Sequence, residues 1–148
     1  MTTAQSIVLL AAIGAVETLA EIEPGEGGDR YAILGDMLEL GNVAVEAHAS
    51  VGRRVAELRL DSLFTVGELG KEIAKAARDG GMAEHRIATF AKAEDAGRFL
   101  QEKLEPGDVV LVKGSAGMRM EKIVKEVMAE PLRAEQQLVR MDKSWENR

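Results

Sequence analysis

Residues 106–121 read PGDVVLVKGSAGMRME, a turn followed by an apolar run and then a polar, glycine-rich segment. The run Asp108–Val112 is almost entirely Val and Leu, which predicts a strand buried on both faces. The residues after it have the i, i+3, i+4, i+7, i+8 spacing of one helix face, namely Met120, Ile123, Val124, Val127 and Met128. This stretch therefore predicts a buried strand, a polar loop and a helix.

The same order of elements repeats along the rest of the chain. Three further short apolar runs predict strands, at residues 31–34, 62–66 and 86–90. Helical spacing predicts helices over residues 7–22, 43–58, 69–77, 96–104 and 120–128. Because helix and strand alternate and the strands are continuously apolar, we expect an α/β fold with a mostly parallel sheet and helices on both faces. Right-handed crossovers make 3-2-1-4 the simplest strand order.

The composition limits the function classes. The 148 residues are 46% hydrophobic and 30% charged, which is typical of one soluble globular domain. The net charge of -6 and the lack of a basic stripe argue against nucleic-acid binding. There is no cysteine, so disulfides and thiolate metal sites are excluded.

The two ends of the chain differ in composition. The apolar run Ile7–Ala15 has no Lys or Arg before it and is too short to cross a bilayer, so we expect a cytoplasmic protein without a membrane segment. Residues 131–148 are polar and charged, and we expect fraying or disorder there. A single domain would then occupy residues 1–130.

Two strand exits are rich in glycine and polar residues, at residues 35–41 and 113–119. Ligands of open parallel sheets bind beyond the carboxyl ends of the strands, where the strand order reverses, and these two exits would meet there. The second exit could form an anion site from the backbone and side chains of Lys113, Gly114, Ser115 and Arg119. It could equally be a turn in which glycine supplies the backbone angles and Ser115 caps a helix.

The remaining candidates are weaker. Asp36 could hold an ammonium or hydroxyl group of a ligand, or serve as a cap or turn residue. His48 lies on the inward side of its helix, where a lone histidine is more often structural than functional. No P-loop, G-x-G-x-x-G, G-x-S-x-G or H-E-x-x-H motif occurs, and two separated histidines make no metal site. We therefore expect no catalytic residue and no metal ligand in this chain.

The motifs resemble one family over residues 14–130. They are LGDMLELG (34–41), EAHASVG (46–52), DSL (61–63), PGDVVLVKGS (106–115) and MRME (118–121). Together they are similar to the Rossmann-like C-terminal domain of the Mur ligases that add D-alanyl-D-alanine to UDP-N-acetylmuramoyl-tripeptide.

The resemblance implies that ATP and Mg²⁺ act in a separate central domain, while this domain closes over the nucleotide and presents the incoming dipeptide. It implies a substrate- or nucleotide-binding role for Asp36, His48 and the 113–119 segment. We expect neither a tightly bound cofactor nor ligase activity in the chain alone. Residues 1–13 are an atypical extension, since the Asp-x-Tyr-Asn-Ala-Asn-Pro motif of the family is absent from Gln5–Ala11.

Two other functions stay open. The chain could be a binding or regulatory module that keeps the fold without catalysis. Its apolar N-terminal helix could also mediate self-association, if it is exposed.

Overall fold

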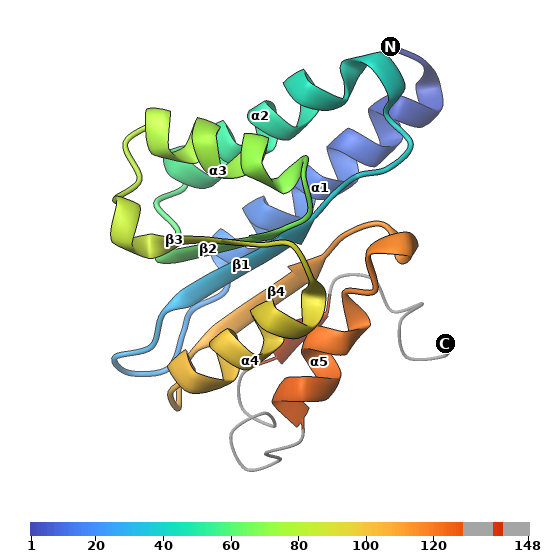
Figure 1. Ribbon diagram of the computed structural model, residues 1–148. Coiled ribbons are helices and arrows are strands. Elements are labelled where there is room, and N and C mark those ends of the chain that lie inside the picture. The colour runs from blue at the N-terminus through green and yellow to red at the C-terminus, as the bar shows by residue number, and fades with distance from the viewer. Residues whose placement is uncertain (129–137, 141–148) are drawn as a thin grey trace.

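A parallel sheet of five strands, in the order β3-β2-β1-β4-β5, is the centre of the molecule (Figure 1). The computed structural model describes residues 1–128 and 138–140. The strands are β1 (Arg30–Gly35), β2 (Ser62–Val66), β3 (Ile87–Phe90), β4 (Val109–Lys113) and β5 (Leu138–Arg140). The predicted α/β class and the order of the first four strands are confirmed.

Helices cover both faces of the sheet, as predicted. On one face lie α1 (Thr3–Glu21), α2 (Ala44–Glu57) and α3 (Gly70–Asp79), and on the other lie α4 (Ala93–Lys103) and α5 (Glu121–Met128) (Figure 1). Short 3₁₀ turns occur at η1 (Gly41–Val43), η2 (Glu84–Arg86) and η3 (Ala116–Met118). Alternate residues of β1, β2, β3 and β4 enter one of two separate apolar cores, which explains why these strands are apolar throughout.

Helix α1 begins four residues earlier than the apolar pattern predicts. Thr2 is its N-cap, and the Thr2 and Gln5 side chains each accept a hydrogen bond from the other's backbone N–H in a capping box. The helix therefore has 19 residues and, by length and composition alone, could cross a membrane. Core helices of soluble proteins can have the same length and apolar composition, so these two properties of α1 are weak evidence of a membrane segment.

The predicted tail, residues 131–148, lies outside the described residues except for 138–140. These three residues form β5, which pairs with β4 in the register Val110↔Leu138 to Val112↔Arg140. We expected residues 131–148 to be a tail outside the domain, and for residues 138–140 this expectation is wrong, because they belong to the sheet. Their backbone groups pair with the edge of β4, which makes β4 an interior strand of the sheet.

Acidic side chains connect the amino ends of β1 and β4. Asp108 is buried, and its two carboxylate oxygens accept hydrogen bonds of 2.8 Å from the backbone N–H groups of Asp29 and Glu105. Asp61 accepts a similar bond of 2.8 Å from the N–H of Arg30. The Asp108 contacts hold β1 against β4 and the Asp61 contact holds β1 against β2, which fixes the relative position of the strand exits at the opposite edge.

Candidate functional site

The exits of β1 and β4 lie side by side and are hydrogen-bonded to each other. Leu34 pairs with Lys113 at the ends of the two strands. Beyond that pair, the N–H of Ser115 donates to the carbonyl of Asp36 at 3.1 Å, and the N–H of Leu38 donates to Ser115 Oγ at 2.9 Å. The predicted convergence of the two polar segments at the point of strand reversal is confirmed.

Close packing, rather than unusual backbone angles, explains Gly35 and Gly114, the glycines that directly end or follow β1 and β4. A Cβ on Gly114 would lie 2.8 Å from Met120 Cγ and 3.2 Å from Gly35 Cα. A Cβ on Gly35 would lie 2.8 Å from Met120 Sδ. Neither glycine has a positive φ, so the alternative that the turn needs glycine for its angles does not hold at Gly114. Met120 packs against both residues and closes the site on the α5 side.

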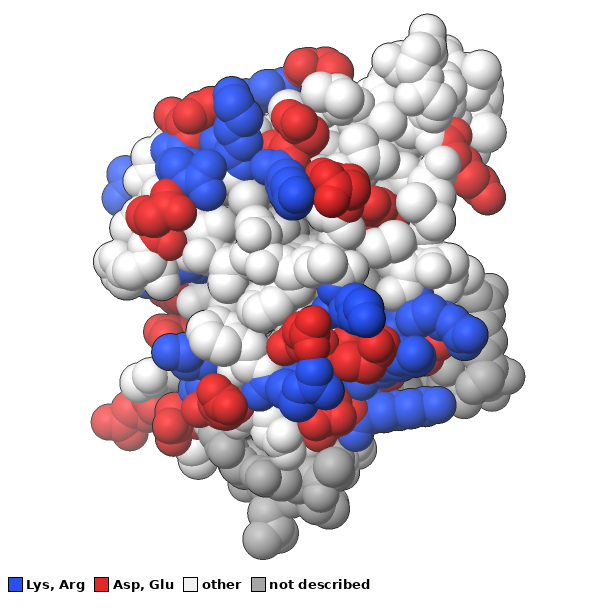
Figure 2. Space-filling view, viewed as in Figure 1, with Lys and Arg blue, Asp and Glu red and all other residues white. Residues whose placement is uncertain are grey.

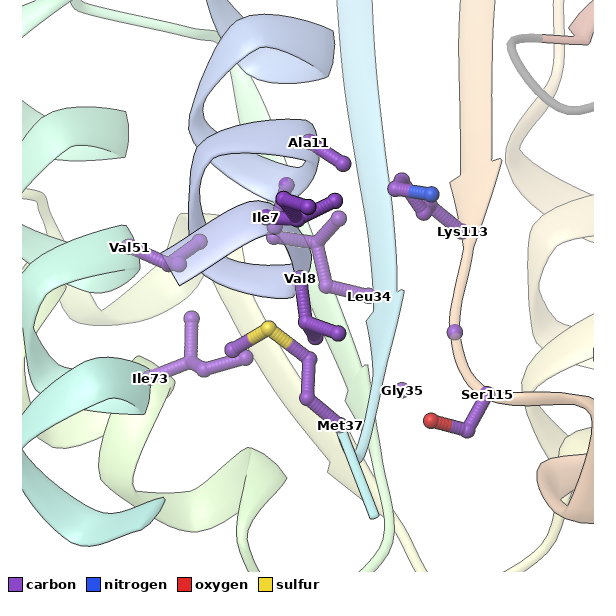
Figure 3. Close-up of a pocket in the computed structure, with 12 residues that line it drawn as sticks. Ile7, Val8, Ala11, Leu34, Gly35, Met37, Val51, Ile73, Lys113 and Ser115 are labelled. Carbon is purple, nitrogen blue, oxygen red and sulfur yellow. The ribbon is translucent and has the colours of Figure 1, made fainter. Parts of the chain in front are cut away.

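A pocket of about 230 Å³ opens between α1 and these exits. Figure 3 shows Lys113 and Ser115 on the β4 side of the pocket and Ile7, Val8 and Ala11 on the α1 side. The rest of the wall is mostly apolar and comes from β1 and the helices behind it: Ala12, Leu34, Gly35, Met37, Val51, Ile73 and Gly114. An ammonium and a hydroxyl at the edge of an apolar hollow suit a small ligand with an anionic end.

Asp36 has a structural partner on a different element. Its side chain is 7% exposed, and Oδ1 accepts a hydrogen bond of 2.8 Å from the N–H of Gly70, the first residue of α3. Asp36 therefore caps the helix that follows the neighbouring strand β2, in agreement with the alternative of a cap residue. The carboxylate fits closely against the loop before α3, where a Cβ on Gly67 would lie 2.5 Å from Oδ1.

His48, on α2, contacts the loop that follows β1. The imidazole is fully buried, Nδ1 donates to the carbonyl of Ala44 at 2.6 Å, and Nε2 accepts from the N–H of Met37 at 2.9 Å. This pair of contacts assigns the proton to Nδ1. Both ring nitrogens are occupied by backbone groups, so the arrangement gives His48 a positioning role for the loop that follows β1.

The segment after β4 differs in detail from the predicted anion site. It does not enter α5 directly but forms η3, and Arg119 then takes a left-handed conformation with φ 56°. The Arg119 side chain is exposed and lies 4.0 Å from Glu121, while Ser115 Oγ makes no capping bond to η3. In Figure 2 the Lys and Arg side chains near the start of α5 lie among Asp and Glu side chains, and Lys122 is paired with Glu94 at 3.2 Å. Arg119 and Lys122 therefore lie next to carboxylates, and no helix N-terminus lies directly at Gly114.

The donor set of the described residues does not fit a metal ion. Within residues 1–128 and 138–140, no three His, Asp or Glu side chains converge in a way that could hold one.

Sequence reasoning missed the α1 wall of the pocket and the partner of Asp36. Ile7 and Val8 lie within the segment that was predicted to be an atypical extension. The helix predicted over residues 7–22 already included both residues, but no local pattern placed that helix against the strand exits. The contact between Asp36 and Gly70 joins residues 34 positions apart, and no local pattern could have predicted it.

Comparison with known proteins identifies the family. The sequence-family model described as Mur ligase, glutamate ligase domain, matches residues 10–116. UDP-N-acetylmuramoyl-tripeptide–D-alanyl-D-alanine ligase of Bacillus subtilis is 35% identical over 105 residues, which are 71% of this chain and 23% of the relative. The corresponding ligase of Synechocystis is 33% identical over 104 residues, or 70% of this chain and 22% of the relative.

Solved structures agree with the sequence relatives. MurF from Acinetobacter baumannii matches with a TM-score of 0.66 and 26% identity, over 79% of this chain and 25% of the other. MurF ligase from Thermotoga maritima in complex with ADP matches with a TM-score of 0.61 and 25% identity, over 78% and 24%. The chain spans about a quarter of the length of these relatives. It belongs to the Mur ligase family, and what it matches is the C-terminal domain of the ligases that add D-alanyl-D-alanine.

Proposed function

We propose that this domain presents D-alanyl-D-alanine to the activated tripeptide in a cytoplasmic, ATP-dependent peptidoglycan-precursor ligase. The observation that carries the proposal is the pocket at the paired exits of β1 and β4. Lys113 and Ser115 lie at its edge, and its walls are apolar. A short dipeptide with methyl side chains and a terminal carboxylate has matching chemistry.

In this proposal the dipeptide carboxylate binds the Lys113 ammonium in a charge-assisted contact. Ser115 Oγ accepts the N–H of Leu38, so its own hydrogen can be donated to the same carboxylate. The methyl groups lie against the apolar wall formed with α1. Asp36 does not hold the dipeptide amine, since it is buried and caps α3. The dipeptide amine attacks in its deprotonated form, and this proposal assigns no group of this domain to bind it or to take its proton.

ATP and Mg²⁺ belong to another part of the ligase in this proposal. The described residues provide no carboxylate cluster for the metal, so no step of the chemistry is assigned to a metal on this domain. What this domain supplies is orientation, because holding the amine near the reacting carbonyl lowers the entropic cost of the reaction. The isolated chain is expected to hydrolyse no ATP, and hydrolysis by the purified chain would contradict this division of roles.

The test is an NMR titration of the chain with D-alanyl-D-alanine, and separately with Mg-ATP. We expect dipeptide shifts centred on Gly35, Gly114 and Ser115, and an affinity about tenfold lower in Lys113→Gln, the loss typical of one charge-assisted hydrogen bond. Lys92→Gln is the matched control, since Lys92 is exposed and does not line the pocket. Equal affinity in wild type and Lys113→Gln would contradict the proposal.

A second experiment, reconstitution of ligase activity, separates a ligase domain from a binding module that keeps only the fold. A ligase fragment lacking its C-terminal domain is mixed with this chain, and D-alanyl-D-alanine addition is measured. Restored addition that is weakened by Lys113→Gln supports presentation of the dipeptide. Dipeptide binding without any restored addition would favour the binding module.

A further inference from the structure

The exposed face of α1 has an unusual composition. No Asp, Glu, Lys or Arg occurs in residues 1–16, although 30% of the whole chain is charged. Ile7 is 62% exposed and Leu10 is 66% exposed, on a helix of which only four residues are buried. In Figure 2 the surface around the N-terminal end of α1, at the upper right, is largely white and contains no Lys or Arg.

The other outer helices do not share this character. Their exposed faces carry ion pairs, such as Glu46–Arg53 on α2, Lys75–Asp79 on α3 and Asp95–Arg98 on α4. Exposed apolar residues elsewhere are isolated, such as Val45 on α2 at 57%. A contiguous exposed apolar stripe on a soluble domain marks a surface that another surface covers.

The stripe has the spacing of a helix–helix contact. Ala4, Ile7, Ala11 and Gly14 follow one another at intervals of three and four residues, which is the a/d pattern of paired helices, and Leu10 lies beside them. Gly14 leaves an opening in the stripe, since a Cβ placed there would have no atom within 4 Å. A large side chain of a second helix can therefore lie over Gly14.

The ends of α1 carry complementary electrostatics. The first turn contains no acidic residue that would offset the positive end of the helix dipole, and the last turn contains no basic residue. Instead Glu21 closes the helix, is exposed, and makes no ion pair within the part of the chain that the structure describes. An antiparallel copy of α1 would bring Glu21 to the positive end of its neighbour. A parallel copy would bring like ends together.

We propose that the α1 stripe (Ala4, Ile7, Leu10, Ala11 and Gly14) binds the same stripe of a second copy of this chain in antiparallel orientation. With Glu21 at the start of the partner helix, Ile7 lies over the partner's Gly14, and Leu10 lies beside the two-fold axis. Such an interface is isologous, so each contact occurs twice and the assembly closes as a dimer. This inference goes beyond the proposed function. Because Ile7 and Ala11 also line the pocket, a second copy and the dipeptide would compete for this face of α1.

The first test is sedimentation equilibrium of the purified chain up to about 1 mM, a concentration that detects even weak association. We expect a monomer–dimer equilibrium, and at least about a tenfold weaker association in Leu10→Glu, because the charge would be buried at the two-fold axis. Val45→Glu is the matched control, with a similar exposed apolar residue outside the stripe. Circular dichroism checks that both variants stay folded. A monomer at every concentration, or equal association of wild type and Leu10→Glu, would overturn the proposal.

The second test uses the absence of cysteine from the chain. A disulfide needs Cα atoms within about 7 Å, which residues beside a two-fold axis can reach. Mild oxidation of Leu10→Cys should therefore give a covalent dimer, and oxidation of Val45→Cys should not. In the antiparallel pair the two copies of residue 7 are about 10 Å apart along the axis, at 1.5 Å per residue. Efficient cross-linking of Ile7→Cys to itself would show a parallel pair and overturn the proposed orientation.

Discussion

The imidazole Nε2 of His48 accepts a hydrogen bond of 2.9 Å from the backbone N–H of Met37. The opposite nitrogen donates to Ala44 of the same helix, so the ring is fixed between α2 and the loop that leaves β1. Because Asp36 and Leu38 flank Met37 and both contact the β4 exit or α3, this one side chain positions the whole β1 side of the site.

Replacement of His48 by Ala should therefore lower the free energy of unfolding by about 3 kcal/mol. The change removes two hydrogen bonds, leaves the Met37 N–H buried without a partner, and opens a cavity in the core. Urea denaturation measures the loss, and hydrogen exchange at the Met37 amide should become faster. His85→Ala is the control, with an expected change within about 0.5 kcal/mol because His85 is exposed. Equal stability of His48→Ala and wild type would mean that the loop is held by other contacts.

Asp36 allows a sharper comparison of two substitutions. Asp36→Ala leaves the buried N–H of Gly70 without its acceptor and should cost about 2 kcal/mol of the free energy of unfolding. Asp36→Asn keeps an oxygen that can accept this bond and should lose less than half as much. Thermal or urea unfolding gives both values, and hydrogen exchange at Gly70 locates the effect. If Asp36→Asn lost as much free energy of unfolding as Asp36→Ala, the carboxylate charge and not the capping bond would account for the stabilisation.

The fold could be predicted from the sequence because its signals are local. The apolar run at residues 62–66 coincides with β2, and the Gly80-Gly81 pair marks the end of α3. The parallel order followed from alternation and crossover handedness. What local signals could not supply was β5 at Leu138–Arg140, a short strand that forms only because β4 offers an unpaired edge.

The site could be predicted only as a meeting of two segments. Glycine and polar residues directly after β1 and β4 were enough to place Lys113 and Ser115 near Asp36. The roles of Asp36 and His48 depend on hydrogen bonds to Gly70 and Met37, which are set by packing between elements. Their residue types are equally consistent with ligand binding, so only the three-dimensional arrangement distinguishes the two roles.

Two helix-interior glycines should respond to alanine with opposite signs. Alanine normally stabilises a helix by about 1 kcal/mol relative to glycine, and Gly14→Ala should follow this rule because its Cβ meets no atom within 4 Å. At Gly52 in α2, the new Cβ would lie 2.1 Å from the carbonyl oxygen of Ile73 and 2.9 Å from Ala76 Cβ. Gly52→Ala should therefore destabilise the fold by about 2 kcal/mol, since α2 and α3 must separate.

Urea unfolding of the two glycine variants, under conditions in which both are monomeric, gives the sign directly. Each variant is the control for the other, because the chemical change and its effect on the unfolded chain are the same. A stabilised Gly52→Ala variant would mean that α2 and α3 can move apart without cost.

Tyr31 gives a prediction for alkaline pH. Burial, followed by the charges of Asp108 and Asp29, raises the pKa of the Tyr31 phenol from 10.0 to about 12 in the folded chain. Above pH 10 the phenol therefore loses its proton more readily in the unfolded chain, which binds fewer protons than the folded one. The free energy of unfolding must then fall as the pH rises from 10 to about 12. Two units of pKa correspond to about 2.7 kcal/mol, of which about 2 kcal/mol is lost by pH 12, where the folded phenol is half ionised.

Because lysines also titrate in this range, the quantity to measure is the difference between wild type and Tyr31→Phe. Below pH 10 the Tyr31 phenol is protonated in both states, and the difference should be constant. Between pH 10 and about 12 the wild type should lose about 2 kcal/mol relative to Tyr31→Phe, which has no phenol to ionise. Parallel curves for the two proteins up to pH 12 would show that the phenol is as free to ionise in the folded chain as in the unfolded one, contrary to its burial against Phe64.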